Sequence, residues 1–269
     1  MHLILTGATG LVGSSVLDAM AKMKDITKIS ILSRRPIPMV EDLHDSRINV
    51  IIHKDFEKYE PELLEKLKGA NGVVWALGIS QNKVTKEEYV KITKDYTLAA
   101  AKAFATLPPD NEPFRFVFVS GEGATQTPGR FSAIFARVKG ETETLLSELR
   151  GSNPRLQTES IRPAFVDCVN HPAIKPYIPN PGMLYNAANV TMGPVVRKLV
   201  PSFVSPTEVL GKFMTEMAMG KHDSGLASGG QGIITLTGGL RIVENVGFRR
   251  LAGLSPAGGS GVDEKTATS

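Results

Sequence analysis

Apolar and polar residues alternate along this chain in a pattern that begins with a strand, a tight turn and a helix. The apolar run Leu3-Ile4-Leu5 is followed directly by the glycine-containing segment 7–13, and apolar residues then recur at helical spacing as far as Met23. A short apolar run predicts a strand, clustered glycines predict a turn, and a period of 3.6 residues predicts an amphipathic helix. We therefore expect these three elements in that order.

The same alternation continues to about residue 162. Further strands are predicted at 28–33, 47–52, 72–78, 114–120 and 156–161, and helices near 60–68, 89–104 and 131–149. The 72–78 run is apolar nearly throughout, which is typical of a parallel strand covered on both faces. Because strands that alternate with helices form right-handed crossovers, we expect a doubly wound α/β fold with a parallel sheet.

The region after Arg162 has a different composition, because prolines recur through it and its apolar residues follow a weaker strand or helix periodicity. Thr85 and Glu88 predict a capping box at the start of the helix that follows them. Ser205 and Glu208 predict a second capping box, with Pro206 at the first helical position. A late strand is predicted at 233–236. We expect residues 1–255 to form one domain, in which about 165–255 cover the substrate, and the small, polar segment 256–269 to be a disordered tail.

Composition narrows the function classes. The 269 residues are 42% hydrophobic and 22% charged, with a net charge of +4 in which basic and acidic residues are interspersed, so nucleic-acid binding is not indicated. The single cysteine, Cys168, and the lack of a leader-like segment favour a reducing, cytoplasmic compartment. No apolar run approaches the length of a bilayer, and the spacing of histidines predicts no metal site.

The glycine turn carries the first chemical signal. Glycines permit a tight turn and close approach of the backbone to a pyrophosphate, and the amides at a helix start favour an anion. With a strand before it and a helix after it, this segment predicts dinucleotide binding rather than a bare turn. The predicted binding residues are Gly7, Thr9, Gly10, Leu11, Val12 and Gly13.

The end of the second predicted strand carries the next signal. A chain that selects NAD usually places Asp or Glu about 20 residues after the glycine turn, to bind the ribose 2′-hydroxyl. Here Ser33, Arg34 and Arg35 stand at that place, and the two guanidinium groups can pair with a 2′-phosphate. We therefore predict NADP(H) over NAD(H). The alternative is that both arginines are solvated loop charges.

Several segments together resemble the atypical short-chain dehydrogenase/reductases, over residues 1 to about 166. They are the glycine turn, Ser33-Arg34-Arg35, Asp55-Phe56, Ala76-Leu77-Gly78, the 119–124 segment, Val138-Lys139-Gly140-Glu141 and Arg162-Pro163-Ala164. Within that superfamily the chain looks most like a small oxidoreductase-like branch with Lys-Gly-Glu after the catalytic tyrosine position. The resemblance implies a Rossmann-type sheet with a small proline-rich C-terminal region over the substrate.

The resemblance also implies roles for particular residues. Asp55, beside Phe56, would bind the adenine amino group, and the loop after Ala76, Leu77 and Gly78 would pass the nicotinamide ribose. The carboxamide would be held by the Pro163 to Val166 segment, with Pro163, Ala164 and Val166 as its contacts.

The catalytic half departs from the family pattern. Such reductases place a tyrosine four residues before a lysine on one helix, so that the ammonium lowers the phenol pKa. Lys139 is present, but the tyrosine position is Phe135, which cannot donate a proton. A positioned general acid is worth about 10²- to 10⁴-fold in rate. Ser120 is followed by Gly121 and Glu122, where the family often has another hydroxyl.

The remaining catalytic candidates follow from this departure. We take Lys139, Ser120 and Tyr185 as catalytic candidates; Lys139 can also bind the nicotinamide ribose, or be an exposed helix lysine. Tyr177 and Glu122 are conceivable substitute acids. The alternatives are that Tyr177 is an ordinary loop tyrosine and that Glu122 is a solvated carboxylate. Phe135 would line the pocket, although core packing explains it equally well.

The C-terminal region suggests the kind of partner. Met183, Leu184, Tyr185, Met192, Val195, Val196, Leu199 and Phe203 give an apolar surface suited to an uncharged organic molecule, or to ordinary core packing. Arg197 and Lys198 admit attachment to an anionic membrane, but two cations are thin support for it.

Three functions remain open. The first is an NADPH-dependent oxidoreductase acting on a small, largely apolar carbonyl or enone. The second is a catalytically silent NADP(H)-binding regulator or scaffold, which Phe135 motivates. The third is a lyase or cyclase that uses the pocket without redox chemistry.

Overall fold

A mixed eight-stranded sheet forms the centre of the protein, whose computed structural model describes residues 1–109, 112–179 and 197–254. The strand order is β3-β2-β1-β4-β5-β6-β10-β9, and all neighbours pair in parallel except β9 with β10. The strands are β1 (His2–Thr6), β2 (Lys28–Ser33), β3 (Ile48–Ile52), β4 (Gly72–Trp75), β5 (Phe114–Val119), β6 (Leu156–Arg162), β9 (Ile233–Thr235) and β10 (Arg241–Glu244). A separate two-stranded sheet pairs β7 (Phe165–Asp167) with β8 (Val204–Pro206).

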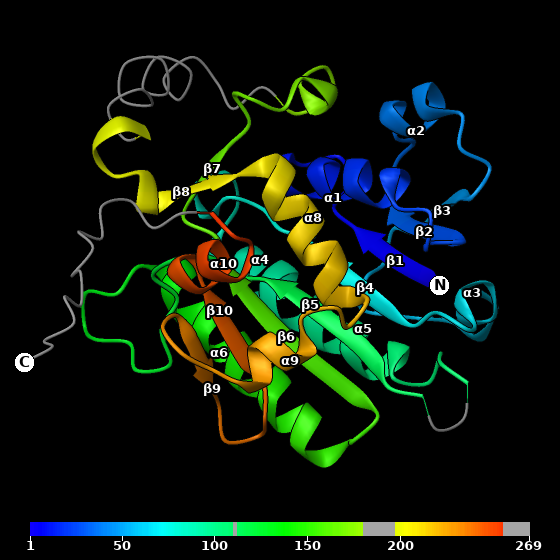
Figure 1. Cartoon of the computed structure of the whole chain (residues 1–269). Helices are drawn as coiled ribbons and strands as arrows, with labels where there is room; N and C mark the ends of the chain where they lie inside the picture. The colour runs from blue at the N-terminus through cyan, green and yellow to red at the C-terminus, as the bar shows by residue number, and fades with distance from the viewer. Residues whose placement is uncertain (110–111, 180–196, 255–269) are drawn as a thin grey trace, which may run out of the picture.

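Helices cover both faces of the large sheet, as Figure 1 shows. The α-helices are α1 (Leu11–Lys22), α2 (Pro38–Leu43), α3 (Pro61–Leu67), α4 (Lys86–Val90), α5 (Tyr96–Phe104), α6 (Ile134–Ser152), α8 (Thr207–Ala218), α9 (Asp223–Ala227) and α10 (Asn245–Leu251). One core cluster includes residues of α1, α8 and α10, and the other includes residues of α3, α5 and α6. This arrangement confirms the predicted doubly wound α/β architecture.

The fold brings α1 and α8 into close contact on one face of the sheet (Figure 1). A side chain at Gly211 of α8 would collide with the carbonyl oxygen of Ser15 in α1, so the two helix backbones touch at that point. α8 is thereby held against the helix that follows the glycine turn.

The strand order reverses between β1 and β4, and this reversal positions the site. β2 and β3 lie to one side of β1, whereas β4, β5 and β6 lie to the other. In open parallel sheets a ligand binds outside the carboxyl ends of the strands at such a reversal. The loops after β1, β2, β4 and β5 therefore meet at one edge of the sheet.

The sequence predicted most of these elements, with differences at their ends. β4 ends at Trp75 rather than at Gly78, so the predicted 72–78 strand includes three residues of the following loop. The capping box of Thr85 and Glu88 is confirmed by both hydrogen bonds. The helix expected from Tyr89 to Phe104 contains a turn of π-helix, η2 (Lys91–Asp95), between α4 and α5.

The predicted capping box at Ser205 is wrong. α8 begins at Thr207 with Pro206 as its N-cap and no side-chain cap bond. The Ser205 hydroxyl is used elsewhere, since it donates to Asn245 Oδ1 (2.6 Å) and accepts from the Ala164 amide (3.0 Å). A tertiary hydrogen bond has replaced the local one.

The last part of the sheet was only half predicted. The strand expected at 233–236 is β9, which lies antiparallel at the edge, whereas β10 and the β7–β8 pair were not predicted. These three strands have three or four residues each, too few to show a period. Their pairing depends on neighbours distant in the sequence.

Some predictions lie outside the described residues. They are the disordered tail 256–269, the catalytic candidate Tyr185, and the apolar residues Met183, Leu184, Met192, Val195 and Val196. Within the described part of the chain, no helix has the length and apolarity to cross a membrane, and no cluster of metal-ligating side chains occurs.

Candidate functional site

The glycine turn between β1 and α1 is built so that only glycine fits at two of its positions. Gly7 has a φ of +73°, and a Cβ there would collide with the carbonyl oxygen of Ala76 at the end of β4. A Cβ at Gly13 would collide with the carbonyl oxygen of Gly7, to which the Gly10 amide donates (2.9 Å). The turn is therefore pressed against both the helix and the neighbouring strand.

The start of α1 is open to an anion. Its N-cap is Gly10, no side chain caps the helix, and the first turn carries no acidic residue. The amides of that turn, at Leu11, Val12 and Gly13, lack intrahelical acceptors by the geometry of a helix start. Together with the helix dipole they can bind a pyrophosphate.

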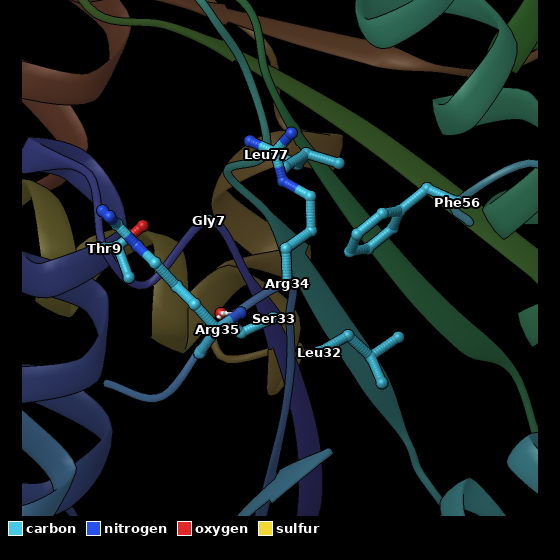
Figure 2. Close-up of a pocket in the computed structure, with 8 residues that line it drawn as sticks. All are labelled: Gly7, Thr9, Leu32, Ser33, Arg34, Arg35, Phe56 and Leu77. Atoms are coloured by element: carbon cyan, nitrogen blue, oxygen red, sulfur yellow. Dashed lines mark hydrogen bonds between the residues drawn. The ribbon is translucent and has the colours of Figure 1, made fainter. Parts of the chain in front are cut away.

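A first cavity of about 430 Å³, which we call the β2-end cavity, lies beside this turn. It is lined by Gly7, Thr9, Leu32, Ser33, Arg34, Arg35, Phe56 and Leu77. Figure 2 shows the two arginine side chains leaving the end of β2 in different directions, Arg35 toward Thr9 and Arg34 toward Leu77. The cavity thus joins the glycine turn to the predicted phosphate-binding residues.

The arginines of this cavity are available for a ligand. Across the described residues, neither Arg34 nor Arg35 has an acidic side chain within ion-pair distance. Ser33 shapes the turn that presents them, because its hydroxyl donates to the Arg35 carbonyl oxygen (2.7 Å).

Asp55 and Phe56 follow β3 on the far side of the β2-end cavity. Phe56 is buried, packs edge-on against Trp75 with ring centroids 6.0 Å apart, and lines the cavity. Asp55 is exposed, accepts the Glu57 amide (3.1 Å), and is not among the lining residues. The aromatic ring, rather than the carboxylate, faces the cavity.

A second cavity of about 320 Å³, the β4-end cavity, lies on the other side of Leu77, which lines both. It is lined by Gly10, Leu11, Val12, Gly13, Ala76, Leu77, Gly78, Ile79, Tyr89, Thr93, Phe118, Val119, Ser120, Lys139, Pro163 and Val166. Nearly all residues predicted for the nicotinamide end meet here. Both cavities are lined in part by residues of the glycine turn, and both contact Leu77.

Lys139 lies in the β4-end cavity with its ammonium against the end of β5. Its Nζ donates to the carbonyl oxygens of Ser120 (2.6 Å) and Val119 (3.2 Å). Burial lowers the pKa of Lys139 to about 8, and the Glu143 carboxylate one turn further along α6 opposes this shift. The charge is held close to the strand end.

Ser120 brings an unsatisfied hydroxyl to the same cavity. Its Oγ is buried and has no hydrogen-bond partner among the described residues, although the side chain lines the cavity. Leaving a buried polar group unpaired costs about 1–3 kcal/mol, so such an atom points to a ligand that satisfies it.

The side chain of Phe135 does not lie where the sequence predicted, which was in the wall of the pocket. It is not among the residues that line the β4-end cavity, and its ring edge lies beside Gly123. Its amide donates to Gln81 Oε1 (2.9 Å). The usual tyrosine position therefore contributes no side chain to this cavity.

Pro163 and Val166 line the β4-end cavity, while Ala164 is fixed by its hydrogen bond to Ser205. Ser205 in turn donates to Asn245 Oδ1. The backbone N–H of Asn245 donates to Glu122 Oε2 (3.3 Å). The Glu122 carboxylate therefore faces the start of α10, which differs from its predicted role as a substitute acid.

Tyr177 also lies elsewhere than expected. Its hydroxyl donates to Asp42 Oδ2 (2.5 Å), and it lines a third cavity of about 230 Å³ together with Thr9, Arg35 and residues 36–39. This corrects the expectation that Tyr177 reaches the substrate, because it lies beside Arg35 of the β2-end cavity.

Sequence reasoning missed Tyr89 and Thr93, which both line the β4-end cavity and are buried. Tyr89 was read only as one position on the apolar face of a helix. The available signal was the spacing of four, which puts a phenol and a hydroxyl on one helix face directly after the predicted capping box.

Taken together, these residues fit a nicotinamide dinucleotide. The turn is shaped so that only glycine fits. In the described part of the chain, the two cations that line the β2-end cavity have no acidic partner, and the buried Ser120 hydroxyl in the β4-end cavity has no hydrogen-bond partner. The combination suits an anionic, phosphorylated ligand that spans both cavities.

Comparison with known proteins gives relatives by sequence but no matching family model. The chain is 44% identical over 159 residues to Botcinic acid biosynthesis cluster B protein 16 of Botryotinia fuckeliana (strain B05.10), covering 59% of this chain and 99% of that protein. It is 37% identical over 238 residues to Leucinostatins biosynthesis cluster protein T of Purpureocillium lilacinum, covering 81% of this chain and 85% of that protein.

Among solved structures, BdcA in complex with NADPH matches with a TM-score of 0.60 and 13% identity, covering 91% of this chain and 93% of that chain. A short-chain type dehydrogenase/reductase from Mycobacterium ulcerans matches with a TM-score of 0.59 and 15% identity, covering 92% and 89%. At such identity the likeness concerns the fold, and it agrees with the strand order described above.

Proposed function

Because this chain has the fold of the NAD(P)-binding Rossmann short-chain dehydrogenase/reductases, we propose that it is an NADPH-dependent oxidoreductase of the atypical type. Its proposed substrate is a small, largely apolar carbonyl or enone. The observation that carries the proposal is the pair of cavities that both contact Leu77 and the glycine turn, one lined by the two arginines and the other by Ser120 and Lys139.

The choice of NADPH over NADH rests on charge at the end of β2. Arg34 and Arg35 line the β2-end cavity, where an NAD-selective chain would carry a carboxylate. A charge-assisted hydrogen bond is worth about 1.5–3 kcal/mol, so two of them favour a 2′-phosphate over a hydroxyl by at least tenfold.

The residues of this chain would hold the cofactor in four places. The start of α1 binds the pyrophosphate, Arg34 and Arg35 bind the 2′-phosphate, Lys139 lies near the ribose next to the nicotinamide, and Pro163 and Val166 form the wall beyond it. When bound, the cofactor supplies a hydride. The protein has to orient the substrate, exclude water and provide a proton.

Two observations support a small apolar substrate. The β4-end cavity is walled in part by apolar side chains, among them Val12, Ile79, Phe118 and Val166. The two sequence relatives are each named for a biosynthesis cluster, which favours a small organic molecule over a macromolecule as the substrate.

The test has two stages. Calorimetric titration with NADPH and NADH should give tighter binding of NADPH, and NADPH oxidation across a panel of ketones, aldehydes and enones should identify at least one substrate. Absence of NADPH binding would contradict the cofactor assignment. Binding without oxidation of any panel member would contradict the oxidoreductase proposal.

A catalytically silent NADP(H) sensor is the second candidate. Phe135 favours it, because the usual proton donor is missing, and so does Lys139, whose ammonium is already bound to two carbonyl oxygens. A lyase or cyclase on this scaffold would convert substrate without consuming NADPH. Product analysis with and without the cofactor separates these functions.

A further inference from the structure

A tyrosine lines the β4-end cavity although the usual catalytic position is Phe135. Tyr89 comes from α4, on a different element from Lys139, and its side chain is 2% exposed. Ser120, Lys139 and Thr93 line the same cavity of about 320 Å³. The fold thus brings a phenol, two hydroxyls and an ammonium to the place where the proposed reaction needs a proton.

The local structure holds Tyr89 firmly. The capping box of Thr85 and Glu88 fixes the start of α4, and the Tyr89 amide donates to the Thr85 carbonyl oxygen (2.9 Å). The π-helical turn Lys91–Asp95 begins two residues later and contains Thr93. Such single π turns often lie at functional sites, because the extra residue changes which side chains face one side of the helix.

The surroundings of Tyr89 suit a proton donor. Burial raises the pKa of the Tyr89 phenol, and the neighbouring Thr93 side chain opposes that rise. The phenol is therefore protonated at neutral pH. The Lys139 ammonium on the cavity wall would stabilise the phenolate that remains after transfer.

We propose that Tyr89 is the proton donor of this protein, in place of the tyrosine that Phe135 replaces, with the Ser120 hydroxyl as a second hydrogen-bond donor to the substrate oxygen. The proposal rests on the proposed oxidoreductase function. The proton donor would then lie on α4, whereas the usual family pattern places the tyrosine on the same helix as the lysine.

The step balances as follows for a carbonyl substrate. The bound cofactor would supply the hydride that forms the new C–H bond, while the carbonyl π bond breaks toward oxygen. The O–H bond of Tyr89 breaks as the new O–H bond forms on the substrate, leaving the phenolate. A solvent proton, passed along the Thr93 hydroxyl, restores the phenol, and the net change is one hydride and one proton added to the carbonyl.

The direct test is Tyr89→Phe, which removes one hydroxyl. We expect kcat to fall at least 100-fold, as for loss of a general acid, while Kd for NADPH stays within about twofold. The matched control is Tyr59→Phe, because Tyr59 is also a poorly accessible phenol without a hydrogen-bond partner among the described residues, and it lines neither cavity. It should leave kcat unchanged.

A second readout does not depend on turnover. The oxidised cofactor carries a positive charge on its nicotinamide, so NADP⁺ bound beside Tyr89 should lower the pKa of this phenol. Alkaline titration followed by tyrosinate absorbance should show one phenol shifted to lower pH by NADP⁺ in the wild type and in Tyr59→Phe. The shift should be missing in Tyr89→Phe, and its persistence there would overturn the proposal.

Thr93→Val tests the same assignment without altering Tyr89. Removing the hydroxyl that lowers the pKa of Tyr89 should move the alkaline limb of the kcat profile to higher pH, and an unmoved limb would count against Tyr89. Full turnover by a folded Tyr89→Phe protein would overturn the Tyr89 assignment alone. Wild-type protein that binds NADPH without turnover would overturn the oxidoreductase function as well.

Discussion

The Glu143 carboxylate and the Arg162 guanidinium form a buried ion pair that joins α6 to the end of β6, with Arg162 Nη2 2.5 Å and Nε 3.0 Å from the two carboxylate oxygens. Ser160 and Gln126 each donate a further hydrogen bond to the same carboxylate. A pair buried this deeply is held in place by several partners at once.

This ion pair positions two parts of the site. Lys139 lies one helical turn before Glu143, and Pro163 follows Arg162 directly, so the pair fixes the lysine-bearing helix against the strand end that lines the β4-end cavity. Stability and site geometry are coupled through it.

Glu143→Ala should therefore destabilise the protein strongly. It leaves the buried Arg162 charge with only the more distant Glu244 carboxylate, 3.8 Å from Nη1. Losing the close partner of a buried ion pair costs about 3–5 kcal/mol, and denaturant unfolding measures this loss. The matched control is Glu141→Ala on the same helix, which removes a surface pair with Lys94 and should cost less than about 1 kcal/mol. Equal losses in both variants would contradict this account.

The double change Arg34→Ala and Arg35→Ala should remove the preference for NADPH. We expect at least a tenfold rise in Kd for NADPH and little change for NADH, because only the former carries the 2′-phosphate that these guanidinium groups would bind. The preference of the wild type should also weaken as salt increases.

The control for this change is Lys24→Ala with Lys102→Ala, two exposed cations on the surface that alter the net charge equally. A preference lost equally in the control would point to overall charge rather than to the β2-end cavity. An unchanged preference in the arginine variant would contradict the cofactor assignment.

Gly13→Ala should disrupt the turn itself. Its Cβ would meet the Gly7 carbonyl oxygen, which cannot move without displacing the turn from Ala76. We expect a stability loss of about 1–3 kcal/mol and loss of NADPH binding. Gly129→Ala, where a Cβ meets nothing within 4 Å, should change neither quantity, and unimpaired NADPH binding by Gly13→Ala would refute the role of the turn.

Lys139 should give the stability a specific pH dependence. Its pKa is lowered to about 8 by burial, whereas a lysine in the unfolded chain has an ordinary pKa of 10.5, so between these values the unfolded chain binds more protons than the folded one. Stability therefore rises with pH across this window because of Lys139. The unfolding free energy of the wild type relative to Lys139→Met should increase from about pH 8 to about pH 10, and a constant difference would show that its pKa is not lowered.

Much of the architecture could be predicted because it depends on local pattern. The run Leu3-Ile4-Leu5, the glycine turn and the alternation up to Arg162 predicted β1 to β6 and the helices between them except the short α2, since burial on both faces requires apolar runs. The same reasoning failed at β10, whose four residues form a strand between β6 and β9.

The site divides in the same way. The sequence by itself determined the glycine turn, the arginines at the end of β2 and Ser120, because each follows directly from a strand end whose backbone direction is fixed. It also placed Lys139 on the helix after β5. Only the tertiary structure decided that Tyr89 lines the cavity, that Tyr177 lies at the opposite end, and that Ser205 binds Ala164 instead of capping α8. These contacts join elements far apart in the chain, and a side chain's partner there is set by packing, which local periodicity does not encode.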